Sequence, residues 1–230
     1  MKKATLCSVL TVFIAMPLTL YLGTQVKSYY LVSTLIILEA TLPFYFSFEA
    51  KKPQARELVM LAVMTALATI SRSAFAFLPH FKPVTAIIML TGIAFGAQAG
   101  FLTGSLTAFV SNFAFGQGFW TPWQMFSYGV SGFLAGLIFH RRTIKNNFRP
   151  LIYAAFGFVA VLLIVGPLLD CSSLFMFSSR LTLASAITIF TVGFSVNILH
   201  ALSCCVTLLL LTKPLLSKLT RLQQKYGMLS

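Results

Sequence analysis

The sequence contains few charged residues and almost no acidic ones. Only 9% of its 230 residues are charged, and four Asp and Glu stand against 17 Lys and Arg, which leaves a formal net charge of +13. A soluble chain of this size needs far more polar surface, because water must solvate its whole exterior. With 58% hydrophobic residues and a mean hydropathy of +0.89, the composition excludes a soluble domain and predicts an all-α polytopic membrane protein.

Cysteine and histidine are also scarce, and their spacing matches no disulfide or metal framework. The four cysteines form no CxxC motif. Three of them, Cys7, Cys204 and Cys205, lie in apolar runs, where cysteine usually packs as a small hydrophobic residue. We therefore expect no disulfide, no bound metal and no other cofactor.

Eight apolar runs predict eight membrane helices. The first two, 4–23 and 28–48, form an N-terminal extension over residues 1–50. We interpret 4–23 as a spanning helix, because no small-residue cleavage site follows it as it would a signal peptide. A six-helix core is expected over residues 51–212. Its helices are predicted at 56–78, 84–95, 100–115, 122–139, 150–169 and 186–211.

Two segments depart from plain spanning helices. The run 84–95 has only 12 residues. Such a helix is about 18 Å long and cannot cross a hydrocarbon layer of about 30 Å alone. In the tail, 213–230, leucines repeat at helical spacing opposite basic residues. This pattern predicts either an amphipathic helix on the anionic inner leaflet or a solvated basic tail.

The basic residues are distributed unequally over the two sides of this arrangement. Thirteen of the 17 Lys and Arg fall on the side of both termini, and the other four fall on or towards the opposite side. Loops rich in Lys and Arg face the cytoplasm, so both termini are predicted to be cytoplasmic. This asymmetry accounts for the positive charge without a nucleic-acid partner. The four exceptions are Lys27, Arg72, Lys82 and Arg180.

The stretch 112–137 is the most unusual part of the chain. A glycine-rich aromatic loop, 115–121, precedes an apolar helix that Pro122 suits at its first turn and that Thr121 could cap. Glycines, tryptophans and glutamines come together at this boundary. This combination favours a loop over a binding cavity rather than a plain connection.

Polar and aromatic residues on the predicted outer side could line the mouth of such a cavity. A charge near the membrane is costly unless it is paired or faces a ligand, so Arg72 is a candidate contact. Snorkelling to the interface, or a pair with Asp170, are the alternatives. An ordinary interfacial belt would explain the tryptophans equally well. The candidates for substrate binding are Arg72, His80, Lys82, Asn112, Gln117, Trp120, Trp123 and Gln124.

Two further ionisable residues lie in apolar runs. Glu39 belongs to the extension, so we expect it to pair structurally or to stay protonated. His200 lies near the middle of the last core helix, and we expect a hydrogen-bonded structural role for it.

Small residues four positions apart occur in three of the predicted core helices. Such pairs let helix backbones approach closely in lipid. Most pack within a bundle, whereas a pair left facing lipid would be a docking surface for a partner. The pairs are Ala62/Ala66, Gly100/Gly104 and Gly132/Gly136.

Residues 52–211 resemble the S components of energy-coupling factor (ECF) transporters, the membrane subunits that capture vitamins in bacteria. The resemblance rests on six core helices, on the basic start at Arg56-Glu57, on the Ala62/Ala66 pair and on the external loop before the fourth core helix. The stretch GQGFWTPWQMF is most similar to S components of the cobalamin group, although Phe119 stands where a proline is expected.

This resemblance implies how the chain works and with which partners. Substrate would bind near the outer face of the bacterial plasma membrane, under the first and third external loops and between the last three helices. Ala62 and Ala66 would dock on a T component, on which the loaded subunit reorients. Two ABC ATPase subunits would supply the energy, because this chain has no Walker motif. The resemblance implies no enzymatic activity and leaves the extension 1–50 without a role.

Two other functions remain as alternatives. Ser131, within Gly129-Val-Ser131-Gly132, and His200 resemble the Ser/His pair of rhomboid intramembrane proteases, if the two side chains meet. That family's further His and Asn on an earlier helix are not evident here. A stand-alone secondary transporter would show repeats and coupling carboxylates, for which only Glu39 is available.

Overall fold

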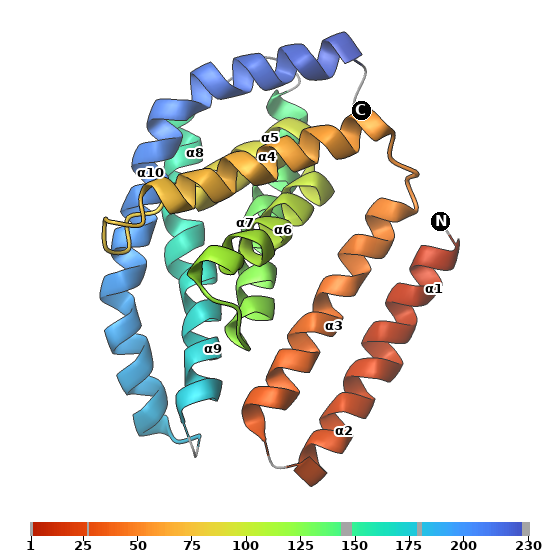
Figure 1. Ribbon diagram of the computed structural model, residues 1–230, viewed down its shortest axis with the longest axis vertical. Helices are drawn as coiled ribbons and strands as arrows, with labels where there is room; N and C mark the ends of the chain where they lie inside the picture. Colours follow the sequence, from red (N-terminus) through yellow and green to blue (C-terminus); the bar gives the residue numbers. More distant parts are fainter. Residues whose placement is uncertain (1, 27, 144–148, 179–180, 227–230) are drawn as a thin grey trace.

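The computed structural model describes residues 2–26, 28–143, 149–178 and 181–226, which fold into helices joined by short turns (Figure 1). Five helical segments among them are long and apolar enough to cross a membrane, which confirms an all-α polytopic membrane protein. The elements are α1 (Lys2–Leu10), the π-helical turn η1 (Thr11–Ala15), α2 (Met16–Val26), α3 (Tyr29–Glu49), α4 (Ala55–Ala74), α5 (Val84–Phe95), α6 (Ala97–Phe115), α7 (Trp120–Thr143), α8 (Pro150–Ala160), the π-helical turn η2 (Val161–Val165), α9 (Gly166–Phe177) and α10 (Leu183–Tyr226).

Each π-helical turn ends two residues before a proline. The turn η1 ends at Ala15 before Pro17, and η2 ends at Val165 before Pro167. Proline has no N–H, and its ring crowds the carbonyl four residues earlier, so a wider turn absorbs it without breaking the helix. The segments α1–α2 and α8–α9 therefore each run as one continuous helix.

The N-terminal extension is a hairpin of α1–α2 and α3 that lies beside the core (Figure 1). The helix α3 packs on α6 and α7. The ring of Phe44 stacks on that of Phe101, with centroids 3.8 Å apart, and the hydroxyls of Tyr45 and Ser105 share a hydrogen bond of 2.9 Å. The hairpin is thus attached to the core by specific side-chain contacts.

Glu39 lies inside this hairpin. Its Oε1 accepts a hydrogen bond of 2.6 Å from the hydroxyl of Thr19, while its Oε2 is buried without a partner. The contact joins α2 to α3, so Glu39 has the structural role within the extension that the sequence predicted.

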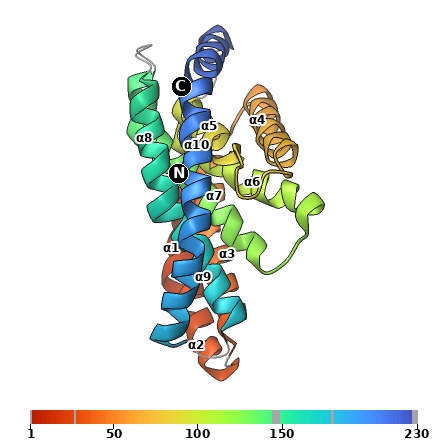
Figure 2. The ribbon, with the colours of Figure 1, turned by 90° about the vertical axis from the view of Figure 1, so that its left-hand side faces the viewer.

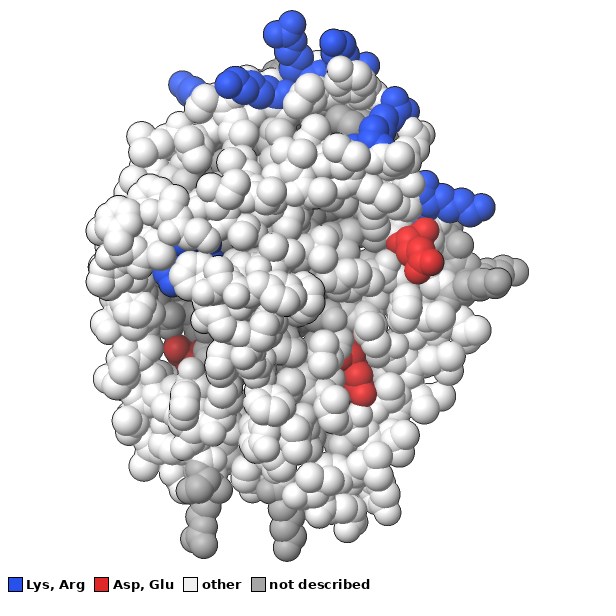
Figure 3. Space-filling model, in the orientation of Figure 1, with Lys and Arg blue, Asp and Glu red and all other residues white. Residues whose placement is uncertain are grey.

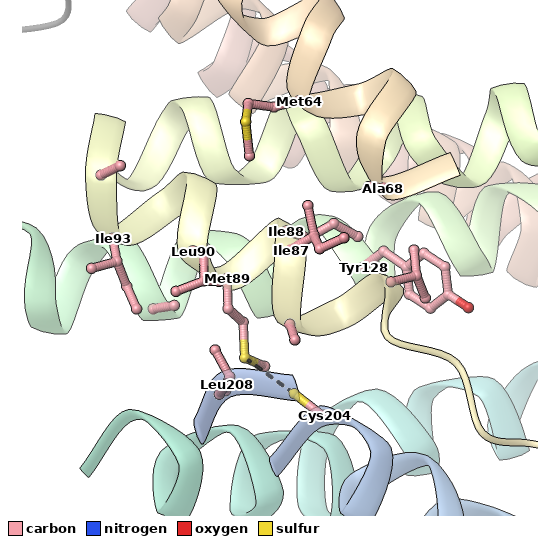
Figure 4. Close-up of a cluster of buried hydrophobic side chains, with 14 of the residues drawn as sticks. Met64, Ala68, Ile87, Ile88, Met89, Leu90, Ile93, Tyr128, Cys204 and Leu208 are labelled. Carbon is pink, nitrogen blue, oxygen red and sulfur yellow. Dashed lines mark hydrogen bonds between the residues drawn. The ribbon is translucent and has the colours of Figure 1, made fainter. Parts of the chain in front are cut away.

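The short helix α5 forms the centre of the core (Figure 4). All 12 of its residues are buried, and it is surrounded by α4, α6, α7 and α10. Met89 accepts a hydrogen bond from the thiol of Cys204 at an S–S separation of 3.8 Å, and Leu208 packs beside it (Figure 4). Because neighbouring helices replace lipid around α5, a helix of 12 residues suffices here. The predicted bounds, 84–95, are confirmed.

Glycines bring α5, α6 and α7 into close backbone contact. A Cβ added at Gly132 on α7 would overlap the carbonyl group of Gly100 on α6, and one at Gly92 on α5 would overlap the carbonyl of Gly132. Added Cβ atoms at Gly104 and Gly136 would also meet backbone of the facing helix. Both predicted glycine pairs therefore serve packing within the bundle.

Gly132→Ala is expected to destabilise the protein by about 2 kcal/mol or more, because backbone atoms must move apart to admit the methyl group. Thermal unfolding of the purified protein in detergent measures the effect. Ala66→Val is the control, because Ala66 lies on the exposed face of α4, where added volume meets no protein. Equal melting temperatures for Gly132→Ala and the wild type would contradict the packing described.

Helix ends differ from the predictions at several places. The helix α7 begins at Trp120, so the prediction that Thr121 caps it is wrong, and Thr121 lies in the first turn. Its hydroxyl instead accepts a hydrogen bond of 3.2 Å from the N–H of Gly118. The helix α4 ends at Ala74 rather than at residue 78, because a residue before proline, here Leu78, disfavours helix.

The predicted tail, 213–230, is a continuation of α10 as far as Tyr226, and its last four residues lie outside the described part. The helix bends and crosses the end of the molecule (Figure 1). Pro214 lies inside it, and proline is the usual cause of such a bend. Leu216 and Leu219 are buried in the core, so this segment packs on the bundle and the solvated-tail interpretation is wrong. The exposed basic side chains are Lys213, Lys218, Arg221 and Lys225.

Lys and Arg gather at one end of the molecule, which we name the basic end (Figure 3). The helix α10 ends there and α1 begins at the side of the same half of the molecule, while α2 and α9 end at the opposite end (Figure 1). Lys27 and Arg180, which the sequence assigns to the opposite side, lie outside the described residues.

Candidate functional site

Asn112 is the centre of a buried hydrogen-bond network that joins α4, α6 and α7. Its Oδ1 accepts from Arg72 Nη1 at 2.9 Å. Its Nδ2 donates to Thr121 Oγ1 at 3.0 Å and to Gln124 Oε1 at 2.9 Å. The guanidinium of Arg72 also donates to the hydroxyl of Ser111. One amide therefore fixes the end of α6 against the first turn of α7 and against the end of α4.

The same network holds the loop 116–119. Thr121 donates to Gln117 Oε1 at 2.9 Å and accepts from the N–H of Gly118, so its one hydrogen and both lone pairs are used. Gln117 Nε2 donates to the carbonyl of Phe109 at 2.9 Å. Gly116 has a φ of +97°, which side chains rarely permit. Polar contacts and one glycine thus fix the shape of this loop.

Arg72 and Lys82 face the same aromatic ring. Arg72 Cζ lies 4.6 Å and Lys82 Nζ 5.2 Å from the ring centroid of Phe115, and Arg72 also lies 5.9 Å from that of Tyr128. Arg72 is only 5% exposed, and its Nε is buried without a hydrogen-bond partner. Lys82, in the turns between α4 and α5, is half-buried. Burial, and then the charge of Arg72, lower the pKa of Lys82.

The two tryptophans have different surroundings. Trp123 is buried, and its ring centroid lies 5.8 Å from that of Phe175, so it joins α7 to α9. Trp120 is 37% exposed, and its ring covers Gly118, where an added Cβ would overlap it. Trp123 therefore belongs to the inner wall of the site, whereas Trp120 covers the loop.

A polar pair that sequence reasoning missed joins α9 to α10. Asp170 Oδ2 accepts from Asn197 Nδ2 at 2.7 Å. Two glycines give this pair its space, because a Cβ at Gly193 would overlap the carboxyl of Asp170 and one at Gly166 would overlap the amide of Asn197. The alternative in which Arg72 pairs with Asp170 is therefore wrong. Asp170 is hydrogen-bonded to Asn197, whereas Arg72 is hydrogen-bonded to two residues of α6, Ser111 and Asn112.

His200 is a buried, hydrogen-bonded residue of α10, as predicted. Its Nε2 and the hydroxyl of Thr85 share a hydrogen bond of 3.4 Å, and its ring meets that of Tyr128 edge-on with centroids 6.4 Å apart. The hydroxyl of Ser131 instead donates to the carbonyl of Tyr128 at 2.7 Å. Each member of the predicted Ser/His dyad thus has another partner, which argues against the protease alternative.

Five of the eight predicted binding residues meet in this cluster, Trp120 and Trp123 lie at its loop and its inner wall, and His80 lies apart from it. His80 is exposed in a turn, with a left-handed φ of +59°. Within the part of the chain that the structure describes, no three His, Cys, Asp or Glu side chains lie close enough to hold a metal ion. The five are Arg72, Lys82, Asn112, Gln117 and Gln124, and the further residues of the cluster, which were not predicted to bind substrate, are Ser111, Phe115, Thr121, Tyr128, Asp170 and Asn197.

Two cavities lie along α3 rather than at this network. One, of about 570 Å³, is bounded by α2, α3 and Phe175 of α9. The other, of about 490 Å³, lies between α3 and the loop 116–119, where Tyr30 contacts the ring of Phe119 edge-on. Their linings are mostly apolar. A specific ligand needs convergent polar groups, so we place the candidate site at the polar and aromatic cluster of α4, α6, α7, α9 and α10.

Residues 52–217 match the family model of the ECF-type riboflavin transporter, S component. The chain belongs to this family. The match covers all of α4 to α9 and most of α10, and hence every residue of the candidate site, while the extension lies outside it. No curated protein and no solved structure gives a significant match to this S component.

An S component is the substrate-binding subunit of an ECF importer and not an enzyme. It works with a T component and ABC ATPases and takes up a small vitamin. The predicted resemblance to ECF S components is thereby confirmed. The finer resemblance to the cobalamin group is not confirmed, because the matching family is of the riboflavin type.

Proposed function

We propose that this S component captures a flavin, riboflavin or a close relative, at the polar and aromatic cluster, away from the basic end. The observation that carries the proposal is the match to the riboflavin-type family, which includes the whole polar and aromatic cluster. Rings of Phe115, Trp123 and Tyr128 offer stacking surfaces for a flat heterocycle. The amides and hydroxyls between them can bond its polar edge. The similarity of residues 116–126 to the cobalamin group makes cobalamin the second candidate.

The basic end is inferred to face the cytoplasm, because cytoplasmic loops of membrane proteins are rich in Lys and Arg. Both termini then lie on the cytoplasmic side, and the loops 75–83 and 116–119 lie on the path from outside. The inference also places the exposed Lys and Arg of the last turns of α10 at the anionic inner leaflet.

A titration of the purified full chain, without any partner, tests the proposed substrate. Riboflavin fluorescence is expected to be quenched with a stoichiometry of one per chain, because an S component binds its substrate alone. Cobalamin, added as a competitor, is expected to leave the quenching unchanged. Displacement of the flavin by cobalamin, or binding of cobalamin alone, would favour the second candidate.

Trp120→Ala and Trp123→Ala are each expected to weaken ligand binding by about tenfold, because each removes a large stacking surface at the loop or the inner wall. Trp120→Phe and Trp123→Phe are the controls that keep a ring. Isothermal titration of the purified variants measures the change. Unchanged affinity in both alanine variants would remove the start of α7 from the site.

The outer face of α4 is proposed to dock on the T component. The small residues Ala62 and Ala66 are exposed there, next to Val59 and Val63, which are 62% and 54% exposed. The helix lies at the rim of the molecule, outside α5 and α6 (Figure 2). Small residues on an apolar face allow another helix to approach closely in lipid. Capture outside would then be followed by reorientation against the T component, powered by the partner ATPases.

A further inference from the structure

We propose that the ligand of this chain carries an anionic group, a phosphate or a carboxylate, which binds between Arg72 and Lys82 beside the ring of Phe115. The inference rests on the proposed function, because it takes the cluster under the loops 75–83 and 116–119 as the substrate site. It narrows the proposed substrate from any flavin to one with an anionic group, such as a phosphorylated flavin.

The first argument is that neither cation has a carboxylate partner. All four acidic residues of the chain lie in the described part. Glu39 is bonded to Thr19 inside the extension, and Asp170 to Asn197. Of the remaining two, Glu57 lies in the first turn of α4, at the opposite end of that helix from Arg72, and Glu49 ends α3, before the linker to α4. Within the described residues, Arg72 and Lys82 therefore remain uncompensated.

The second argument is the state of the Arg72 guanidinium. Its Nη1 donates to two neutral acceptors, Ser111 and Asn112, which satisfy hydrogen bonds but not the charge. Its Nε is buried and has no acceptor at all. A buried cation in a membrane protein is costly unless it is paired or bound to a ligand. An orphaned donor on a residue that is only 5% exposed indicates an absent acceptor.

The third argument is that the two cations lie close together. Both lie about 5 Å from the centroid of one ring, Phe115, so they are at most about 10 Å apart. The ring attracts each cation weakly and does not remove their mutual repulsion. Burial and the charge of Arg72 also lower the pKa of Lys82. An anion with several oxygens can accept hydrogen bonds from both side chains at once. Its negative charge offsets the repulsion between the two cations and favours the charged form of Lys82.

Riboflavin and its 5′-phosphate form the test pair, because they differ only in the anionic group. Binding is measured by flavin fluorescence on the purified full chain in nanodiscs at low ionic strength. The phosphate is expected to bind about tenfold more tightly than riboflavin. Lys82→Met should abolish that preference, Lys82→Arg should retain it, and Lys213→Met, an exposed lysine at the basic end, should not affect it. Equal or tighter binding of riboflavin by the wild type would overturn the anion proposal and leave the flavin proposal intact.

A second readout separates the two proposals if neither flavin binds, which would refute the flavin substrate. The melting temperature is then compared in inorganic phosphate and in chloride at matched ionic strength. A phosphate-specific increase in the wild type and in Lys82→Arg, but not in Lys82→Met or Lys82→Gln, supports the anion site. The absence of an increase, or the same increase in all four proteins, overturns it. Two neutral variants are used so that a folding defect in one of them does not decide the result.

Discussion

The double variant Ala62→Trp with Ala66→Trp is expected to bind ligand like the wild type and to lose transport. Both residues lie on the exposed face of α4, one turn apart, so the new side chains meet no protein within the chain. On a docked partner helix, they would hold the two backbones several ångströms further apart and remove dispersion contacts along the crossing. Arg72 points to the buried face of the same helix, so the ligand site is not disturbed.

Uptake into proteoliposomes that contain the T component and the ATPases measures the loss, together with pull-down of the T component. Ala155→Trp on α8 is the matched control, because Ala155 is also an exposed alanine on a membrane helix but lies on another face. It should transport normally. If the double variant loses ligand binding or misfolds, the alanine pair serves packing within the protein itself, and the docking proposal is contradicted. If it transports normally, this face of α4 has no role in coupling.

Asn112→Ala is expected to weaken ligand binding by about ten- to a hundredfold and to lower the melting temperature. The substitution leaves Arg72 Nη1, Thr121 and Gln124 each without one buried hydrogen-bond partner. Each such loss costs about 1–3 kcal/mol, and more where a charge is involved. The loop 116–119 also loses its attachment to the end of α6, so the site is no longer preorganised.

Titration calorimetry and thermal unfolding of the same preparation measure the two effects. Gln224→Ala is the control, because this amide is exposed on α10 far from the network. Wild-type affinity in Asn112→Ala, combined with a lowered melting temperature, would make the network purely structural. An unchanged melting temperature would contradict the network itself.

The element that sequence predicts best is α5, and the reason is local. A run of 12 apolar or small residues between Pro83 and Gly96 can form one short helix and little else. Its length alone requires that protein surround it. The role of the glycine pairs on α6 and α7 could also be predicted from the sequence, because small residues at helical spacing on two neighbouring helices indicate close packing.

The residues that sequence reasoning missed depend on contacts between distant segments. Asp170 and Asn197 are 27 residues apart, and only the packing of α9 on α10 brings the carboxyl to the amide. Arg72 and Lys82 both face the ring of Phe115, and this arrangement depends on the path of the turns after α4. Asn197 lies one helical turn before His200 in an apolar helix, and this spacing is the signal that could have revealed it.

The predicted ends of α7 and α10 were wrong because tertiary contacts outweigh local propensity. The hydroxyl of Thr121 serves the network around Asn112 rather than a cap, so the helix begins earlier. Pro214 suggests a helix end, yet burial of Leu216 and Leu219 on the bundle stabilises the turns that follow it. Local signals predict which helices exist, whereas neighbouring helices decide where they end.

The central claim is that the chain captures a micronutrient in the absence of the T component and the ATPases. Mass spectrometry of small molecules that co-purify with the chain tests this claim. The chain is expressed and purified in the absence of any T component and ATPase, and Asn112→Ala is treated in parallel. The account predicts one small molecule per chain, a flavin with an anionic group, that is depleted in Asn112→Ala. A wild-type chain that carries no ligand alone, and binds one only when T component and ATPases are added, would contradict it.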